Sequence, residues 1–100
     1  PSCALRLEAD GRTLSYSGDT EWVEGLIPCA EGADLFIVEC YGYDKPVPYH
    51  TNWATLSPNL ARLGAKRVLI THMNDDMLAR REEARATGAL LAEDGLVVDI

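Results

Sequence analysis

Four polar side chains could together bind a metal ion and move a proton, and they are Asp19, Glu39, His50 and His72. Asp19, Glu39 and His72 each lie at the end of, or shortly after, a segment with the pattern of a strand. His50 comes just before a segment with the pattern of a helix. Carboxylate oxygen combined with imidazole nitrogen suits zinc, manganese or iron better than a soft metal. These residue types therefore indicate a metal site with acid–base groups beside it.

The elements that must position these residues alternate between strand and helix. Strands are predicted at residues 3–9, 12–16, 34–40, 66–71 and 96–100. Helices are predicted at residues 20–27, 51–63 and 74–87. Asp10-Gly11 is a typical two-residue hairpin turn between the first two strands, and the apolar alternation of Cys3, Leu5, Leu7 and Ala9 predicts the buried face of the first. Strands separated by helices indicate an α/β fold with parallel neighbours.

This arrangement predicts that the four polar residues meet. In a right-handed α/β arrangement the carboxyl ends of the parallel strands lie along one edge of the sheet, where ligand sites form. If strand 12–16 joins the sheet in parallel, Asp19, Glu39 and His72 share that edge. His50 can reach the same edge from the end of the loop at 41–49.

Each of these residues also has a purely structural explanation. Asp19 could cap the helix expected to begin near Thr20. Glu39 could form an ion pair at the end of its strand, and His50 could cap a helix or lie on the surface. His72 could be a hydrogen-bonded structural histidine. The convergence of the chain's two histidines on strand-to-helix junctions favours a site over these separate explanations.

Composition restricts the class of protein. The 100 residues carry nine Lys+Arg and 16 Asp+Glu, a formal net charge of −7. This charge disfavours non-specific binding to nucleic acid, which relies on basic side chains that displace counterions. Apolar residues make up 47%, as in a soluble globular domain, and no apolar run approaches the length of a membrane-spanning helix. We expect a single piece with no membrane partner.

The three cysteines, Cys3, Cys29 and Cys40, have no C-x-x-C spacing. This pattern predicts reduced thiols in a cytoplasmic protein, without a disulfide framework or a zinc knuckle. Cys40 with His50 or His72 as its base is an alternative nucleophile, although no local sequence signature supports it.

Several short segments, taken in chain order, share one resemblance. The segment Tyr16-Ser17-Gly18-Asp19-Thr20 resembles the SGDT motif of the metallo-β-lactamase superfamily, whose aspartate bridges two metal ions. The segment Leu69-Ile70-Thr71-His72-Met73 resembles its last histidine motif. Phe36-Ile37-Val38-Glu39-Cys40 and Pro48-Tyr49-His50-Thr51 are similar to the glutamate and histidine of the ribonuclease Z-like and cyclic-phosphodiesterase branches. The closing residues 92–98 resemble the strand that ends many such domains.

The resemblance implies a fold, a site and an activity. The fold would be the C-terminal half of an αββα sandwich, and the protein a metal-dependent hydrolase with two divalent ions, zinc or alternatively manganese or iron. Asp19 would bridge the ions and His72 would bind one of them. His50, oriented by Glu39, would contact the scissile phosphate of a small phosphodiester or ester substrate. Because antibiotic-hydrolysing members commonly have cysteine at this position, Asp19 makes a true β-lactamase less expected.

One part of the superfamily's pattern is absent from the sequence. The signature H-x-H-x-D-H, which supplies most of the metal ligands, does not occur in residues 1–100. We therefore expect the chain to be the C-terminal half of one domain, inactive by itself, with the ligands of an N-terminal half upstream of Pro1. It would partner that half or form a homo-oligomer. The alternative is a non-catalytic α/β binding or interaction module in which the histidines are structural.

Overall fold

The computed structural model describes residues 5–100, which form a five-stranded sheet in the order β1-β2-β3-β4-β5. The strands are β1 (Leu5–Ala9), β2 (Arg12–Tyr16), β3 (Leu35–Glu39), β4 (Val68–Thr71) and β5 (Leu90–Leu91). β1 and β2 pair in an antiparallel hairpin, and every later neighbour is parallel. The predicted α/β class is confirmed. The part of the first predicted strand at residues 3–4 lies outside the described residues.

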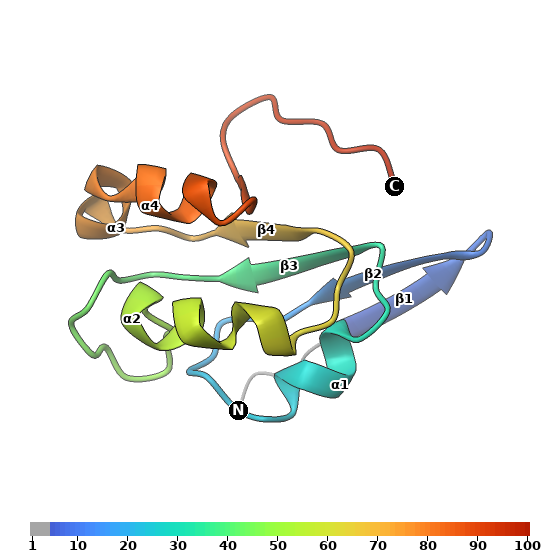
Figure 1. The fold of residues 1–100 in the computed structure, drawn as a ribbon, viewed down its shortest axis with the longest axis horizontal. Coiled ribbons are helices and arrows are strands. Elements are labelled where there is room, and N and C mark those ends of the chain that lie inside the picture. The colour runs from blue at the N-terminus through green and yellow to red at the C-terminus, as the bar shows by residue number, and fades with distance from the viewer. Residues whose placement is uncertain (1–4) are drawn as a thin grey trace.

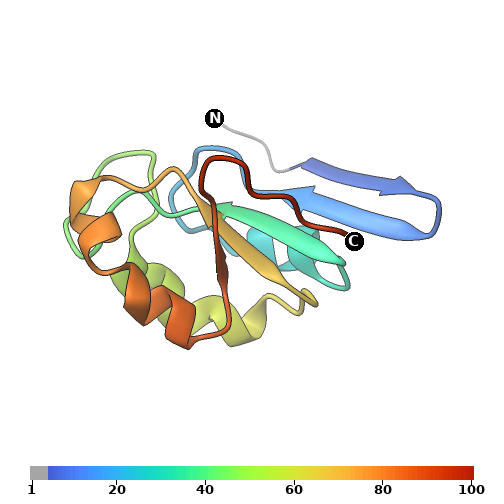
Figure 2. The same cartoon turned by 90° about the horizontal axis from the view of Figure 1, so that it is seen from above.

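The helices cover one face of this sheet (Figures 1 and 2). They are α1 (Leu26–Ala30), α2 (Trp53–Leu56), the 3₁₀ helix η1 (Ser57–Arg62), α3 (Asp75–Ala79) and α4 (Arg81–Ala86). Phe36, Val38 and Ile70 of the sheet pack against fully buried residues of these helices, such as Leu56 and Met77. No helix within residues 5–100 has the length and hydropathy that crossing a membrane requires.

The opposite face of the sheet carries no helix and is apolar. Side chains alternate along a strand, so the neighbours of Phe36, Val38 and Ile70 point to this face. Together with their register partners they form what we call the open face, whose residues are Leu5, Leu7, Leu14, Tyr16, Leu35, Ile37, Leu69 and Leu90. Leu5 is 56% exposed and Leu7 is 61% exposed. The exposed part of this face is its edge at β1, because Leu35 is only 4% exposed and the other members are partly buried.

The prediction that the apolar face of β1 is buried is wrong. Its apolar residues Leu5 and Leu7 are exposed, and Arg6 lies on the side of the helices. The Arg6 guanidinium donates to the carbonyls of Cys29 and Glu31 at 2.9 and 2.8 Å. The last carbonyls of a helix lack partners within the helix, so α1 draws the cation toward its C-terminal end.

Two further predictions on the elements are wrong. No strand forms at residues 96–100, because the last strand is β5, and Arg67 instead donates to the carbonyl of Asp99. The first helix does not span 20–27 but begins at Leu26 and contains Pro28. Proline is tolerated there because amide groups of a helix's first turn have no partner within the helix.

The two later helices form where they are predicted, but each divides in two. The segment 51–63 contains α2 and then η1, with a proline in the first turn of η1. The segment 74–87 contains α3 and α4, which meet at Arg80, whose φ of −111° lies outside the helical range. Asn52 and Asn74 cap α2 and α3 by accepting the amides of Thr55 and Met77.

Candidate active site

The carboxyl ends of β3 and β4 bring three of the predicted residues together. The two strands run in the same direction, and Glu39 at the end of β3 pairs with Thr71, the residue before His72 (Figure 1). The loop between β3 and α2 returns His50 to this edge. One potential ligand atom from each of Glu39, His50 and His72 lies within 4.8 Å of the other two. The predicted meeting of these three residues is confirmed.

Glu39 and His50 form a hydrogen-bonded pair at the centre of the site. The Glu39 side chain is fully buried, and its Oε1 lies 2.6 Å from Nδ1 of His50. Its other oxygen, Oε2, accepts the backbone amide of Thr51 at 2.9 Å. Burial raises the pKa of the Glu39 carboxyl, although the Thr51 amide and His50 oppose this by stabilising the charged form. With both oxygens engaged, Glu39 is suited to orienting His50 and leaves Nε2 of the imidazole for a ligand.

Two hydroxyl residues that sequence reasoning missed hold the loops around this pair. Ser17 accepts the amide of Glu39 at 3.0 Å and donates to the carbonyl of Gly18 at 2.8 Å. Thr51 donates its hydroxyl to the carbonyl of Thr20 at 2.6 Å. Ser17 and Thr51 are both buried. They belong to the short sequence motifs around Asp19 and His50, and this position is the feature of the sequence that could have indicated their role.

His72 lies at the exposed side of the site in a strained backbone conformation. Its φ is +61°, in the left-handed region that costs a residue with a side chain about 1–2 kcal/mol. The ring centroids of His72 and His50 are 5.4 Å apart, with their planes 29° from parallel. A backbone held in this region against its preference is a feature of functional sites. His72 is therefore not a buried, hydrogen-bonded structural histidine.

Asp19 lies in the loop after β2 and is exposed, outside the close group of three. Its explanation as a helix cap does not hold, because α1 begins only at Leu26. Burial, followed by the negative charges of Asp19 and Glu39, raises the pKa of the Tyr16 phenol. The negative charges of Asp19 and Glu39 are therefore both near Tyr16, at the end of β2.

Cys40 belongs to the core rather than to the site. Its side chain is fully buried, and its thiol lies 3.7 Å from the carbonyl of Gly42. Burial, followed by the charge of Glu39, raises the pKa of the Cys40 thiol to about 12. The nucleophile in a thiol reaction is the thiolate. These facts argue against Cys40 as a nucleophile.

The buried thiol leads to a labelling prediction. At about pH 8, a pKa of about 12 leaves roughly one Cys40 thiol in 10⁴ ionised. We expect iodoacetamide to leave Cys40 unmodified in the folded chain and to label it after denaturation, with peptide mass mapping as the measurement. The half-buried Cys29 is the internal control. Equal labelling rates of Cys40 and Cys29 in the folded chain would contradict the assignment.

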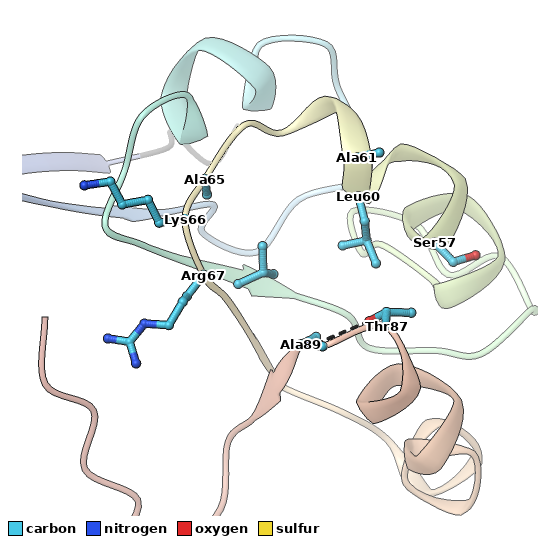
Figure 3. Close-up of a pocket in the computed structure, with 10 residues that line it drawn as sticks. Ser57, Leu60, Ala61, Ala65, Lys66, Arg67, Thr87 and Ala89 are labelled. Atoms are coloured by element: carbon cyan, nitrogen blue, oxygen red, sulfur yellow. Dashed lines mark hydrogen bonds between the residues drawn. The ribbon is translucent and has the colours of Figure 1, made fainter.

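Two cavities differ in their relation to the site. A cavity of about 220 Å³ reaches His50 and is lined by Glu21, Trp22, Val47 and Asn52, among others. A larger one of about 430 Å³ lies at the amino ends of β4 and β5. Figure 3 shows Leu60 and Thr87 facing each other across it, with the basic side chains of Lys66 and Arg67 extending away. Its lining has no histidine, cysteine or carboxylate, whereas the smaller cavity includes both Glu21 and His50.

Comparisons with known proteins identify the family to which the chain belongs. The family described as "Beta-lactamase superfamily domain" matches residues 1–73. The uncharacterized protein ML1173 of Mycobacterium leprae is 32% identical over 76 residues, which cover 72% of this chain and 27% of that protein. For the uncharacterized protein Rv1339 of Mycobacterium tuberculosis the identity is 30%, with coverage of 72% and 28%. The chain thus spans little more than a quarter of these relatives.

A solved structure is similar over nearly the whole chain. The metallo-β-lactamase fold protein YhfI from Bacillus subtilis superimposes with a TM-score of 0.77 at 25% identity, covering 96% of this chain and 43% of that one. The chain therefore has the metallo-β-lactamase fold over the part that it covers. By its sequence and its fold, the chain belongs to the metallo-β-lactamase superfamily.

Proposed function

We propose that this chain forms the C-terminal half of a metal-dependent hydrolase of phosphodiesters or related small esters, of the ribonuclease Z-like or cyclic-phosphodiesterase type. The observation that carries the proposal is the hydrogen bond of 2.6 Å between buried Glu39 and His50, beside His72 at the same sheet edge. A carboxylate that fixes an imidazole, with the second ring nitrogen free, is the arrangement of a proton donor or of an oriented ligand.

In this proposal His50 acts on the substrate. When Glu39 is ionised, it accepts the hydrogen bond from Nδ1–H of His50, which fixes the orientation of the ring. Nε2–H of that imidazole would neutralise the charge that develops on a phosphoryl oxygen, or protonate the leaving oxygen. The adjoining cavity beside Trp22 and Val47 would receive part of the substrate.

His72 and Asp19 would hold the metal ions. Exposed imidazole and carboxylate side chains at one sheet edge are suitable donors for two divalent ions, of which zinc is the first choice and manganese or iron the alternatives. When bound, such ions polarise a phosphoryl oxygen and lower the pKa of bound water. Two ligands are fewer than the three protein ligands of a usual catalytic zinc site.

The remaining ligands would come from an N-terminal half that carries H-x-H-x-D-H. The exposed Leu5 and Leu7 of the open face support this proposal, because they offer an apolar edge against which a second half could pack. The share of YhfI that this chain covers, 43%, leaves room for such a half. A second copy of the chain is the alternative partner. We place the protein in the cytoplasm because its cysteines form no disulfide pattern.

The proposal is tested by comparing the chain with the longer protein that joins it to this N-terminal half. We expect the longer protein to bind about two divalent ions and to hydrolyse bis(p-nitrophenyl) phosphate. The isolated chain should show no turnover above background, because its ligand set is incomplete. Metal content is measured by elemental analysis and turnover by nitrophenol release. Turnover by the isolated chain in proportion to its bound metal would contradict the division of the site, and a metal-free, inactive longer protein would favour a binding module.

A further inference from the structure

A third aromatic ring contacts both histidines of the site. The centroid of the Tyr41 ring lies 4.8 Å from that of His50 and 5.4 Å from that of His72. With the 5.4 Å between the two imidazoles, the centroids mark a nearly equilateral triangle. The two imidazoles are stacked, with their planes 29° from parallel, whereas the Tyr41 ring is tilted by 30° against His50 and by 34° against His72.

The backbone of Tyr41 ties this ring to the loops that carry the histidines. Its amide donates to the carbonyl of Thr51, the residue after His50, at 3.0 Å. Its carbonyl accepts the amide of Asn74, two residues after His72, at 2.7 Å. A shift of either loop therefore moves the Tyr41 ring, and the ring in turn limits how the imidazoles move.

The two histidines differ in how firmly other residues hold them. His50 is fixed by Glu39, whereas His72 is exposed and follows a strained backbone turn. An exposed imidazole with few contacts samples several rotamers, and binding a ligand must then restrict them. The aromatic contacts of His72 among the described residues are those with Tyr41 and His50. Tyr41 thus contacts the ring of His72, which has no carboxylate partner like the one that Glu39 provides for His50.

We infer that Tyr41 is a positioning residue whose ring packs against both His50 and His72 and holds the two imidazoles at a fixed spacing. The inference deepens the proposed function, on which it rests only in treating these imidazoles as ligand-binding groups. The aromatic ring carries the role, and the phenol hydroxyl is not required. No bond is made or broken by Tyr41.

The contacts of the Tyr41 ring are tested first by NMR on the full chain. In the wild type we expect nuclear Overhauser contacts between the Tyr41 ring and both imidazoles, and ring-current shifts of both imidazole signals. Tyr41→Leu should move both signals toward the positions of a free histidine, and Tyr41→Phe should keep them. Tyr43→Leu is the matched control, because the Tyr43 ring contacts Arg80 and lies two residues away. If Tyr41→Leu does not fold, the nuclear Overhauser contacts of the wild type and the imidazole signals of Tyr41→Phe still test whether the Tyr41 ring contacts both histidines.

A second readout is the affinity for Zn²⁺ alone, measured by titration of the longer protein. We expect Tyr41→Leu to weaken binding by about tenfold, as loss of a residue that orients a ligand does, whereas Tyr41→Phe and Tyr43→Leu stay within about twofold of the wild type. Wild-type imidazoles without Tyr41 contacts, or a loss in Tyr41→Phe equal to that in Tyr41→Leu, would overturn the inference. A wild type that binds no Zn²⁺ would count against the proposed function, while the NMR result would still decide the role of Tyr41.

Discussion

Replacing His50 by alanine in the longer protein is expected to lower kcat by about 10²- to 10⁴-fold, the usual contribution of a positioned acid or base. Glu39→Gln is expected to lower it by about 10- to 100-fold, as loss of an orienting partner does. In the proposed function, Glu39 orients His50 through the hydrogen bond of 2.6 Å to its Nδ1, so that the opposite nitrogen can act on the substrate. Initial rates with bis(p-nitrophenyl) phosphate give both values.

Glutamine has the shape of Glu39 but cannot replace both of its hydrogen bonds. If its oxygen accepts from His50, its NH₂ group faces the amide of Thr51, so two donors meet in a buried place. A donor left without a partner in the interior costs about 1–3 kcal/mol, so thermal unfolding of Glu39→Gln should also begin at a lower temperature.

A matched control separates stability from activity. Asp34 lies just before β3, at the end opposite Glu39, and its carboxylate accepts the Thr13 amide at 2.8 Å and Lys66 at 3.1 Å. Asp34→Asn should lower stability and leave kcat within about twofold, since Asp34 is not positioned to contact the substrate. If Asp34→Asn and Glu39→Gln lost activity equally, the effect of Glu39 would be one of folding. Unchanged kcat in His50→Ala would remove His50 from the chemistry.

The second large effect concerns the metal. We expect His72→Ala and Asp19→Ala each to lower the bound divalent metal of the longer protein and to reduce turnover by about 10²-fold or more, because a metal ion contributes several kcal/mol to stabilising the transition state. Asp19→Ala should lose more metal if Asp19 bridges two ions. Metal analysis after dialysis, alongside turnover, measures both. Asp75→Ala, which changes an exposed carboxylate three residues beyond His72, serves as the control.

The backbone of His72 adds a test that is independent of activity. Glycine adopts a φ of +61° without the side-chain clash that alanine keeps, although it also loses more entropy on folding. His72→Gly is therefore expected to be more stable than His72→Ala by about 0.5–1 kcal/mol in urea unfolding, while both lose metal equally. Metal retained in both variants would place the ligand elsewhere. Equal stability of the two would contradict the conformation of this turn.

The sequence predicted the parts of this site that depend on strand direction. The uninterrupted apolar run of β3 and the apolar residues of β4 predict parallel strands whose carboxyl ends share one edge, and in the structure this edge has Glu39 paired with Thr71, the residue before His72. Asn52 and Asn74 cap helices near where these are predicted, because their side chains accept amides of the first turn.

Other parts depend on contacts that a pattern along the chain does not encode. The alternation in β1 predicts a buried face, but the carbonyls at the end of α1 determine that Arg6 lies on the side of the helices. The packing of Tyr41 against two imidazoles requires two loops at once, the one between β3 and α2 and the one after β4. Ser17 and Thr51 bridge segments that the sequence keeps more than 20 residues apart, as in the bond between Thr51 and Thr20 with its separation of 31.

The strand order has a consequence for how the site assembles during folding. Because the order in the sheet is the order in the chain, each strand can add to the edge formed by the one before it. Folding is fast when partners are near in sequence. Glu39 and His50 are separated by 11 residues and can meet once β3 and its loop are in place. His72 joins Tyr41 and His50 only when β4 pairs with β3. The step that completes this group of three rings is therefore also the step that positions the proposed metal ligand His72.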